Sequence, residues 1–237
     1  MLRLKMLKDT HFLIVRHILG SKYVRKELRN FIRPMCDDEI AFYSWISDEL
    51  DRDNLEYGYW YHSYKLRETS KGDLELVRGA LPLAIGALYW DCKNKYREGN
   101  FTVCRQNLIK ISHYTIDSCS MPHVVEKEAD FIHKTFEEDI DKTIDKTLRE
   151  ITQLKIEYAL AKEAGYINID KRVDMWCHEI YKKYKEKIIR LYKNKENIND
   201  SKYDKLRREI IKDCCIWTLE VLQATYEHMM FPPIARY

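Results

Sequence analysis

Hydrophobic residues recur every three or four positions along most of this chain, which is the spacing of one face of an α-helix. An early example is the segment 10–32, in which Phe12, Val15 and Ile18 fall on one face. Asp9 or Thr10 is a suitable N-cap for that helix. After residue 140 no segment alternates with period two, as a half-buried strand would. The pattern therefore predicts an all-α chain.

Polar or glycine-containing breaks divide the rest of the chain into further helices. We expect helices over 37–47, 72–98, 101–118, from about 128 onward, and over 140–164, 170–195 and 201–230. Asp37 is the expected cap of the second helix, and Pro82 is expected to kink or break the third. The aromatic segment 48–65 and residues 119–127 are expected to be loops.

The amino-acid composition agrees with a helical protein and says little about the class of function. The chain has 237 residues, which is enough to bury a substantial core, and only seven Gly and five Pro. Few turn residues favour long helices over a sandwich or barrel. The net charge of +3 points neither to nucleic acid nor to anionic lipid as a partner.

Cysteine usage and hydropathy indicate the cellular compartment. The seven cysteines are odd in number, irregularly spaced and without a CxxC pair, which is typical of reduced thiols and not of a disulfide framework. No apolar run reaches transmembrane length. The first residues are interrupted by charges and lack the apolar region of a secretory signal. We therefore expect a cytoplasmic protein with no signal peptide and no transmembrane segment.

The segment 113–137 holds the candidate chemistry. His113 and Asp117 are four residues apart, and so are His133 and Glu137, so each pair lies on one helix face. His123 lies between the pairs and follows a proline that marks a break between helices. Imidazole and carboxylate groups together are good zinc ligands. A surface ion pair is the plainer interpretation of each pair taken alone.

The order HxxxDxxxxxH followed by HxxxE resembles the zinc-dependent phospholipase C family, which shares its fold with the single-strand-specific zinc nucleases. The flanking sequence agrees with the family as well: GNF begins at Gly99, a tyrosine follows His113, and Phe136 precedes the glutamate. The resemblance covers about residues 9–140. It implies a single helical domain of the zinc phospholipase C and P1 nuclease type.

The resemblance also identifies ligands far from the central segment. The family's N-terminal histidine corresponds to His11, within the string THFLIV. Its aspartate and next histidine correspond to Asp48 and His62. Asp48 is preferred to Asp51 or Asp53 because its distance from His62 along the chain falls within the family's range.

The family pattern distributes these residues over three zinc positions. One zinc would be held by Asp48, His62, His113 and Asp117, a second by His123, His133 and Glu137, and a third by His11, Asp117 and the amine of Met1. The expected cofactor is therefore zinc, at about two to three ions per chain.

Several of these ligands have structural interpretations as well. His11 fits the edge of a core, Asp48 fits a cap, and His62 fits an aromatic patch around a buried histidine. His17, His178 and His228 lack a partner set, and we expect them to be structural or surface residues.

The implied activity is that of a zinc-dependent phosphodiester hydrolase resembling phospholipase C. Zinc-bound hydroxide would attack phosphorus, and Asp48 would orient or deprotonate the attacking water. The expected substrate is a phospholipid or a related headgroup ester. One alternative is a zinc single-strand nuclease, because the string WISDEL resembles the sequence around the aspartate of those nucleases. The other is a non-catalytic helical protein that zinc stabilises.

The domain prediction is one all-α domain over 1–237. Its metal-site core would occupy about 1–140, and extra helices would occupy about 141–237. These extra helices either cover the metal-binding helices or mediate oligomerisation.

Overall fold

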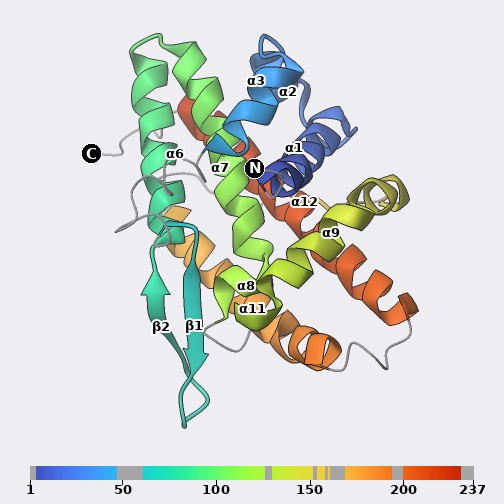
Figure 1. Cartoon of the computed structure of the whole chain (residues 1–237). Coiled ribbons are helices and arrows are strands. Elements are labelled where there is room, and N and C mark those ends of the chain that lie inside the picture. Colours follow the sequence, from blue (N-terminus) through green and yellow to red (C-terminus); the bar gives the residue numbers. More distant parts are fainter. Residues whose placement is uncertain are drawn as a thin grey trace.

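Helix α7 (Phe101–Cys119) runs through the middle of the computed structural model, and the other long helices surround it (Figure 1). The structure describes residues 4–46, 61–125, 130–151, 154–157, 160, 169–193 and 200–230. Over these residues it is mostly helical, so the helical prediction is confirmed. Within the described part of the chain, no helix is both long and apolar enough to span a bilayer.

The remaining elements follow in chain order. They are α1 (Leu4–Gly20), α2 (Lys26–Ile32), α3 (Asp37–Tyr43), β1 (Tyr64–Glu68), β2 (Leu74–Gly79), α6 (Leu81–Arg97), α8 (Met121–Val124), α9 (Asp130–Glu150), α11 (Ile169–Lys193) and α12 (Asp200–Met230).

Helix α7 is central, and its second half is buried on every face. Between Asn107 and Cys119 every residue is buried except Lys110, which is half-buried. A helix that can bury all its faces belongs inside a bundle. Its small polar residues Ser112 and Thr115 donate their hydroxyls to carbonyls of the preceding turn, so they do not require outside partners.

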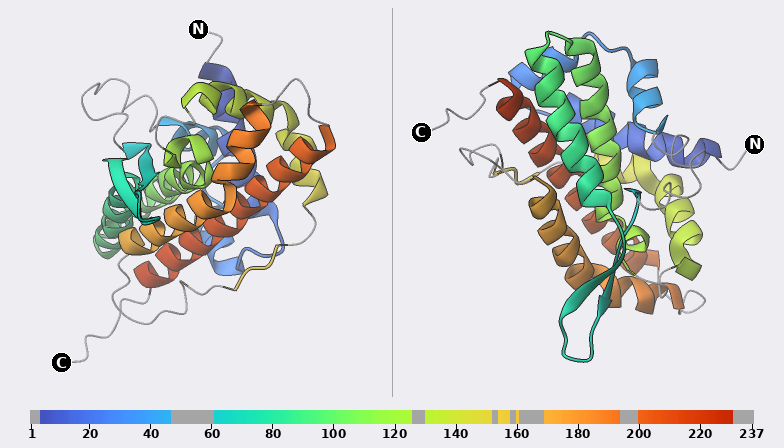
Figure 2. Two further views of the ribbon diagram at one scale, coloured as in Figure 1. Left: turned by 90° about the horizontal axis from the view of Figure 1, so that it is seen from below. Right: turned by 90° about the vertical axis from the view of Figure 1, so that its left-hand side faces the viewer.

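The surrounding helices bury one apolar face each. Helices α6 and α12 pack along α7, α11 crosses α6 and α7, and α1 packs against α9 (Figures 1 and 2). One cluster of buried side chains joins these elements from Ile14 in α1 to Met229 in α12. Gly86 lets α6 approach α11 closely, since a Cβ there would lie 2.8 Å from the Asp170 carboxylate.

The prediction of an all-α chain is wrong in one place, because a β-hairpin interrupts the helices. Strands β1 and β2 pair antiparallel, with a bulge between Lys65 and Leu66. The expected loop over 48–65 and helix over 72–98 both overlap this hairpin. Its inward positions, Tyr64 and Leu66, are buried, but so short a strand offers too few of them to show a period of two.

The hairpin extends beyond the helices and is anchored at its base (Figure 2). Leu66 forms a parallel bridge with Val125, directly after α8. Because His62 precedes β1 and His123 lies in α8, this bridge holds two predicted ligands near each other.

Several predicted helix ends are also corrected. The expected helix over 10–32 is two helices, α1 and α2, with a turn after Gly20. The helix predicted from 140 to 164 ends at Glu150 as part of α9. Pro82 neither kinks nor breaks a helix, because it lies in the first turn of α6, where a missing N–H has no cost.

The expected N-caps are replaced by other residues. Asp9 and Thr10 lie inside α1, which begins at Leu4. Cys36 is the N-cap of α3, and Asp37 is the first residue of that helix.

We predict that Gly79→Ala destabilises the protein more than Gly72→Ala. Both glycines have positive φ, 107° and 83°, where an alanine costs about 1 kcal/mol of the unfolding free energy. At Gly79 the new Cβ would also lie 2.0 Å from the Ser63 carbonyl oxygen, whereas at Gly72 the nearest atom is 4.0 Å away. Urea unfolding measures both. Equal losses would contradict a steric role for Gly79.

Candidate metal centre

The carboxylate of Asp117 lies at the centre of the candidate site. It comes from the last turns of α7 and is only 4% exposed. Its two oxygens face different histidines: Oδ1 lies 3.1 Å from His11 Nε2, and Oδ2 lies 2.9 Å from His62 Nδ1. Helix α1 and the segment before β1 therefore meet α7 at one side chain.

Three donor atoms form a close triangle on the Oδ2 side. His113 Nε2 lies 3.1 Å from His62 Nδ1 and 3.3 Å from Asp117 Oδ2, and the third edge is the 2.9 Å contact above. Ligand atoms bound tetrahedrally to zinc at 2.0–2.1 Å are about 3.3 Å apart. The triangle thus has the dimensions of one face of such a site.

His11 extends this group toward the N-terminal helix. His11, His113 and Asp117 are all buried, and each offers a ligand atom within 4.8 Å of the others. The His11 ring stacks on the His113 ring, with centroids 4.4 Å apart. This buried group can hold a metal ion.

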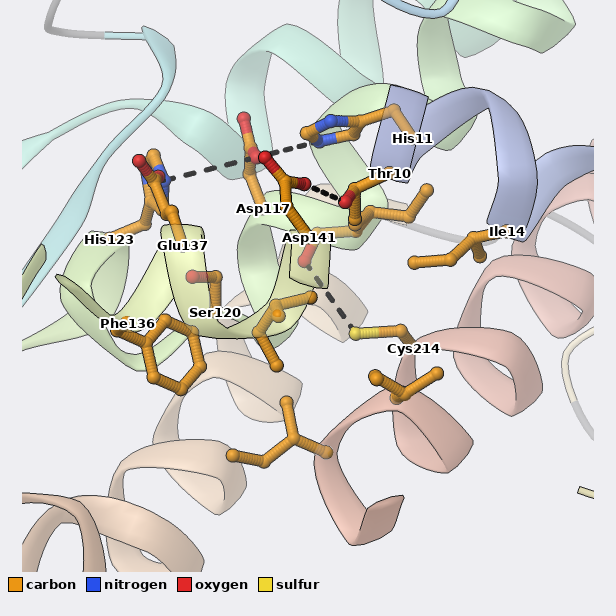
Figure 3. Close-up of a pocket in the computed structure, with 14 residues that line it drawn as sticks. Thr10, His11, Ile14, Asp117, Ser120, His123, Phe136, Glu137, Asp141 and Cys214 are labelled. Atoms are coloured by element: carbon orange, nitrogen blue, oxygen red, sulfur yellow. Dashed lines mark hydrogen bonds and ion pairs between the residues drawn. The ribbon is translucent and has the colours of Figure 1, made fainter. Parts of the chain in front are cut away.

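His123 and Glu137 form the adjoining part of the site. His123 Nε2 lies 3.3 Å from Glu137 Oε1 and 3.9 Å from Asp117 Oδ1. These side chains come from α8 and α9. Asp117 Oδ1 therefore lies between His11 on one side and His123 on the other (Figure 3).

Backbone carbonyls orient two of the histidines. His113 Nδ1 lies 2.7 Å from the carbonyl oxygen of Ser44, and His123 Nδ1 lies 2.7 Å from that of His62. A carbonyl only accepts, so these contacts assign the N–H to Nδ1 in both rings. Each Nε2 then faces the carboxylates. Metal-binding histidines are usually held by such a hydrogen bond.

The electrostatics of Asp117 favour its charged form. Burial by itself raises the pKa of a carboxyl group. Here the charges of His113 and His123, together with hydrogen bonds from His11 and His62, outweigh burial and hold the Asp117 pKa well below its usual 3.8. Asp117 is therefore an anion buried among imidazoles.

His123 shows the complementary effect. Burial lowers its pKa, and Lys65 also opposes the charged imidazole. The Asp117 charge and the hydrogen bond to Glu137 are stronger, so the His123 pKa is raised above the usual 6.5. A proton on His123 occupies the position from which its Nε2 would bind a metal ion.

A small pocket opens beside these residues, with a cavity volume of about 50 Å³ (Figure 3). Asp117, His123 and Glu137 form part of its polar wall. The rest is largely apolar, with isoleucines from α1, α7, α9 and α12 and Phe136. Helix α12 thus helps to enclose the site, as expected if the C-terminal helices cover the metal-binding helices.

The structure brings together the predicted ligands whose side chains it describes: His11, His62, His113, Asp117, His123 and Glu137. Met1 and Asp48, with its competitors Asp51 and Asp53, lie outside the described residues. His133 lies in α9, but its side chain is also outside them.

The three histidines expected to be structural are not among these residues. His228 is buried and contacts the Tyr89 hydroxyl at 3.1 Å. His178 lies beside its own helix carbonyl at Asp174. Burial lowers the pKa of His17, which is half-buried.

Two features of the site were not found from the sequence. The Ser44 carbonyl carries no signal, because every residue has one. Asp141 also lines the pocket, and its distance of four residues from Glu137 could have shown that both share one face of α9.

We predict a pH-dependent stability for the metal-free protein that involves His123. Its pKa is raised on folding, so its contribution is fully present below about pH 6.5 and is lost as the pH rises through the folded-state value. His123→Ala should therefore reduce the difference in unfolding free energy between about pH 6 and about pH 8.5. Urea unfolding after chelator treatment measures this.

His178→Ala is the matched control for removal of a histidine outside the candidate site. An unchanged pH dependence in His123→Ala would contradict the assignment.

Comparisons with known proteins assign no family to this chain. No protein-family model matches the chain, and no curated protein is significantly similar to it. The functional interpretation therefore depends on the residues themselves.

Proposed function

We propose that this protein is a zinc-dependent phosphodiester hydrolase of the phospholipase C type, with the helical fold of that family and of the P1-type nucleases. The main support is the triangle of His62 Nδ1, His113 Nε2 and Asp117 Oδ2, whose edges of 2.9–3.3 Å match the spacing of zinc ligands. The ring orientations set by the Ser44 and His62 carbonyls support it as well.

The two oxygens of Asp117 suit a carboxylate shared between metal positions. In this proposal Asp117 would hold one ion together with His62 and His113, and another together with His11. His123 and Glu137, with His133, would hold a further ion. Asp48 and the Met1 amine complete the sets as the resemblance implies.

Zinc, when bound, supplies Lewis acidity and lowers the pKa of water toward neutrality. The side chains of the protein supply the other contributions. Asp117 offsets positive charge at the centre, and the carbonyl-bound imidazoles keep their Nε2 atoms fixed. Asp48 is the proposed acceptor for the proton of the attacking water.

The pocket favours a phospholipid or headgroup ester over nucleic acid. Its polar wall contains Asp117, His123 and Glu137, and its apolar wall suits a short hydrocarbon group next to a phosphoester. A net charge of +3 provides no strong attraction for a polyanion.

Burial supports a second candidate, a non-catalytic protein that zinc stabilises. His113 is fully buried and Asp117 nearly so, and structural zinc sites are closed to exchangeable water. The pocket beside His123 and Glu137 argues for the catalytic alternative, because it leaves space next to the donors.

We predict that untagged protein retains zinc through gel filtration and that Asp117→Asn loses most of it. The substitution keeps the size of the side chain but removes the charge that faces four imidazoles. Elemental analysis gives zinc per chain, and His178→Ala should retain the wild-type amount. Wild-type protein without zinc would refute the proposed function.

We further predict zinc-dependent hydrolysis of bis(4-nitrophenyl) phosphate, with a loss on the order of 100-fold or more in Asp117→Asn. Phosphatidylcholine vesicles and single-stranded DNA, assayed side by side, identify the natural class. Cleavage of DNA alone would favour the nuclease. Bound zinc that raises the melting temperature, without cleavage of any of the three, would favour the structural protein.

A further inference from the structure

Thr10 and Asp141 form a hydrogen bond that none of the ligand assignments includes. The Thr10 hydroxyl, in α1, donates to the Asp141 carboxylate, in α9, across 131 residues of sequence. Thr10 is buried, and both residues line the pocket next to the candidate metal centre. In Figure 3 the Asp141 carboxylate points toward Thr10, on the same side of the pocket as His11 and Asp117.

Each partner is placed beside a candidate ligand. Thr10 directly precedes His11 in α1, and Asp141 follows Glu137 by one helical turn, on the same face of α9. The hydrogen bond therefore connects the helix that carries His11 with the helix that carries Glu137.

Apolar residues of both helices also lie near this hydrogen bond. Ile14 of α1 and Ile140 of α9 line the pocket close by, and apolar contacts of this kind are not directional. A hydrogen bond to a carboxylate is directional and strong when it is buried. It can set both the rotation of α1 about its axis and its height along α9.

The position of the His11 ring depends on the rotation and height of α1. Its Nε2 has to reach Asp117 Oδ1 at 3.1 Å while its ring stacks on His113 at 4.4 Å. A rotation of α1 about its axis would move the His11 ring relative to Asp117 and His113, which both lie in α7.

We propose that Thr10 and Asp141 are positioning residues for the metal site: their hydrogen bond holds α1 against α9 so that His11 reaches its ion. This inference rests on the proposed zinc binding.

The test measures zinc affinity by competition with a chromogenic chelator. Thr10→Val removes the hydroxyl at nearly constant shape, Thr10→Ser keeps it, and Asp141→Leu removes the accepting carboxylate. Thr143→Val is the matched control, because this threonine is also half-buried in α9 but donates only to carbonyls of its own helix. Circular dichroism confirms that each variant is folded.

We expect Thr10→Val and Asp141→Leu each to weaken binding of the most affected zinc ion about 10- to 100-fold, the usual effect of losing a residue that orients a ligand. The double variant should lose no more than either single one. Thr10→Ser and Thr143→Val should bind as the wild type does.

His11→Ala separates positioning from general stability. If the hydrogen bond acts through His11, Thr10→Val should cause no further loss of zinc affinity in the His11→Ala background. The same loss in both backgrounds would overturn the proposal, and so would unchanged affinity in Thr10→Val. A loss in Asp141→Leu alone would overturn it in favour of direct ligation by Asp141. Wild-type protein that binds no zinc would instead refute the proposed function.

Discussion

The buried negative charge of Asp117 is the constraint on which the arrangement of this protein depends. A carboxylate 4% exposed among packed helices is strongly unfavourable unless positive charge and hydrogen-bond donors surround it. The chain meets this requirement with imidazoles from α1, from the segment before the hairpin, from α7 itself and from α8. Protons on those rings would satisfy this need, and so would a metal ion bound there. The two would compete for one place, so that metal affinity would be coupled to pH.

Backbone carbonyls orient two of the candidate ligand rings. The last carbonyls of a helix have no partner within it. Ser44 is the C-cap of α3, and its carbonyl orients His113. The His62 carbonyl, just before β1, orients His123 in the same way. The short helix α3 and the base of the hairpin thus have a definite role, because their carbonyls orient His113 and His123.

What could be predicted from the sequence follows the range of the interactions. His113 and Asp117 are four residues apart, and so are His133 and Glu137. Residues with this spacing share one face of a helix, so the sequence alone indicates that the two members of each pair lie together. His11 and His62 reach Asp117 only through the tertiary fold, and no pattern near them shows this; they were found through the family resemblance. The helical class was predictable from a period sustained over many turns. The hairpin could not be predicted, because β1 has only five residues. The ends of α1 and α9 could not be predicted either, because the hydrophobic periodicity continues across short turns. Carbonyl contacts to Ser44 and His62 have no sequence signal at all.

The span of sequence between the ligands has a consequence for folding. The contact between His11 and Asp117 joins residues 106 apart, and that between His62 and Asp117 joins residues 55 apart. In an unfolded chain only pairs four residues apart could meet often, so weak local binding would come first and full affinity only after α1 and the hairpin had docked. Ions held by these residues would then act as late cross-links. Like disulfides, they would close loops of those lengths and restrict the unfolded chain.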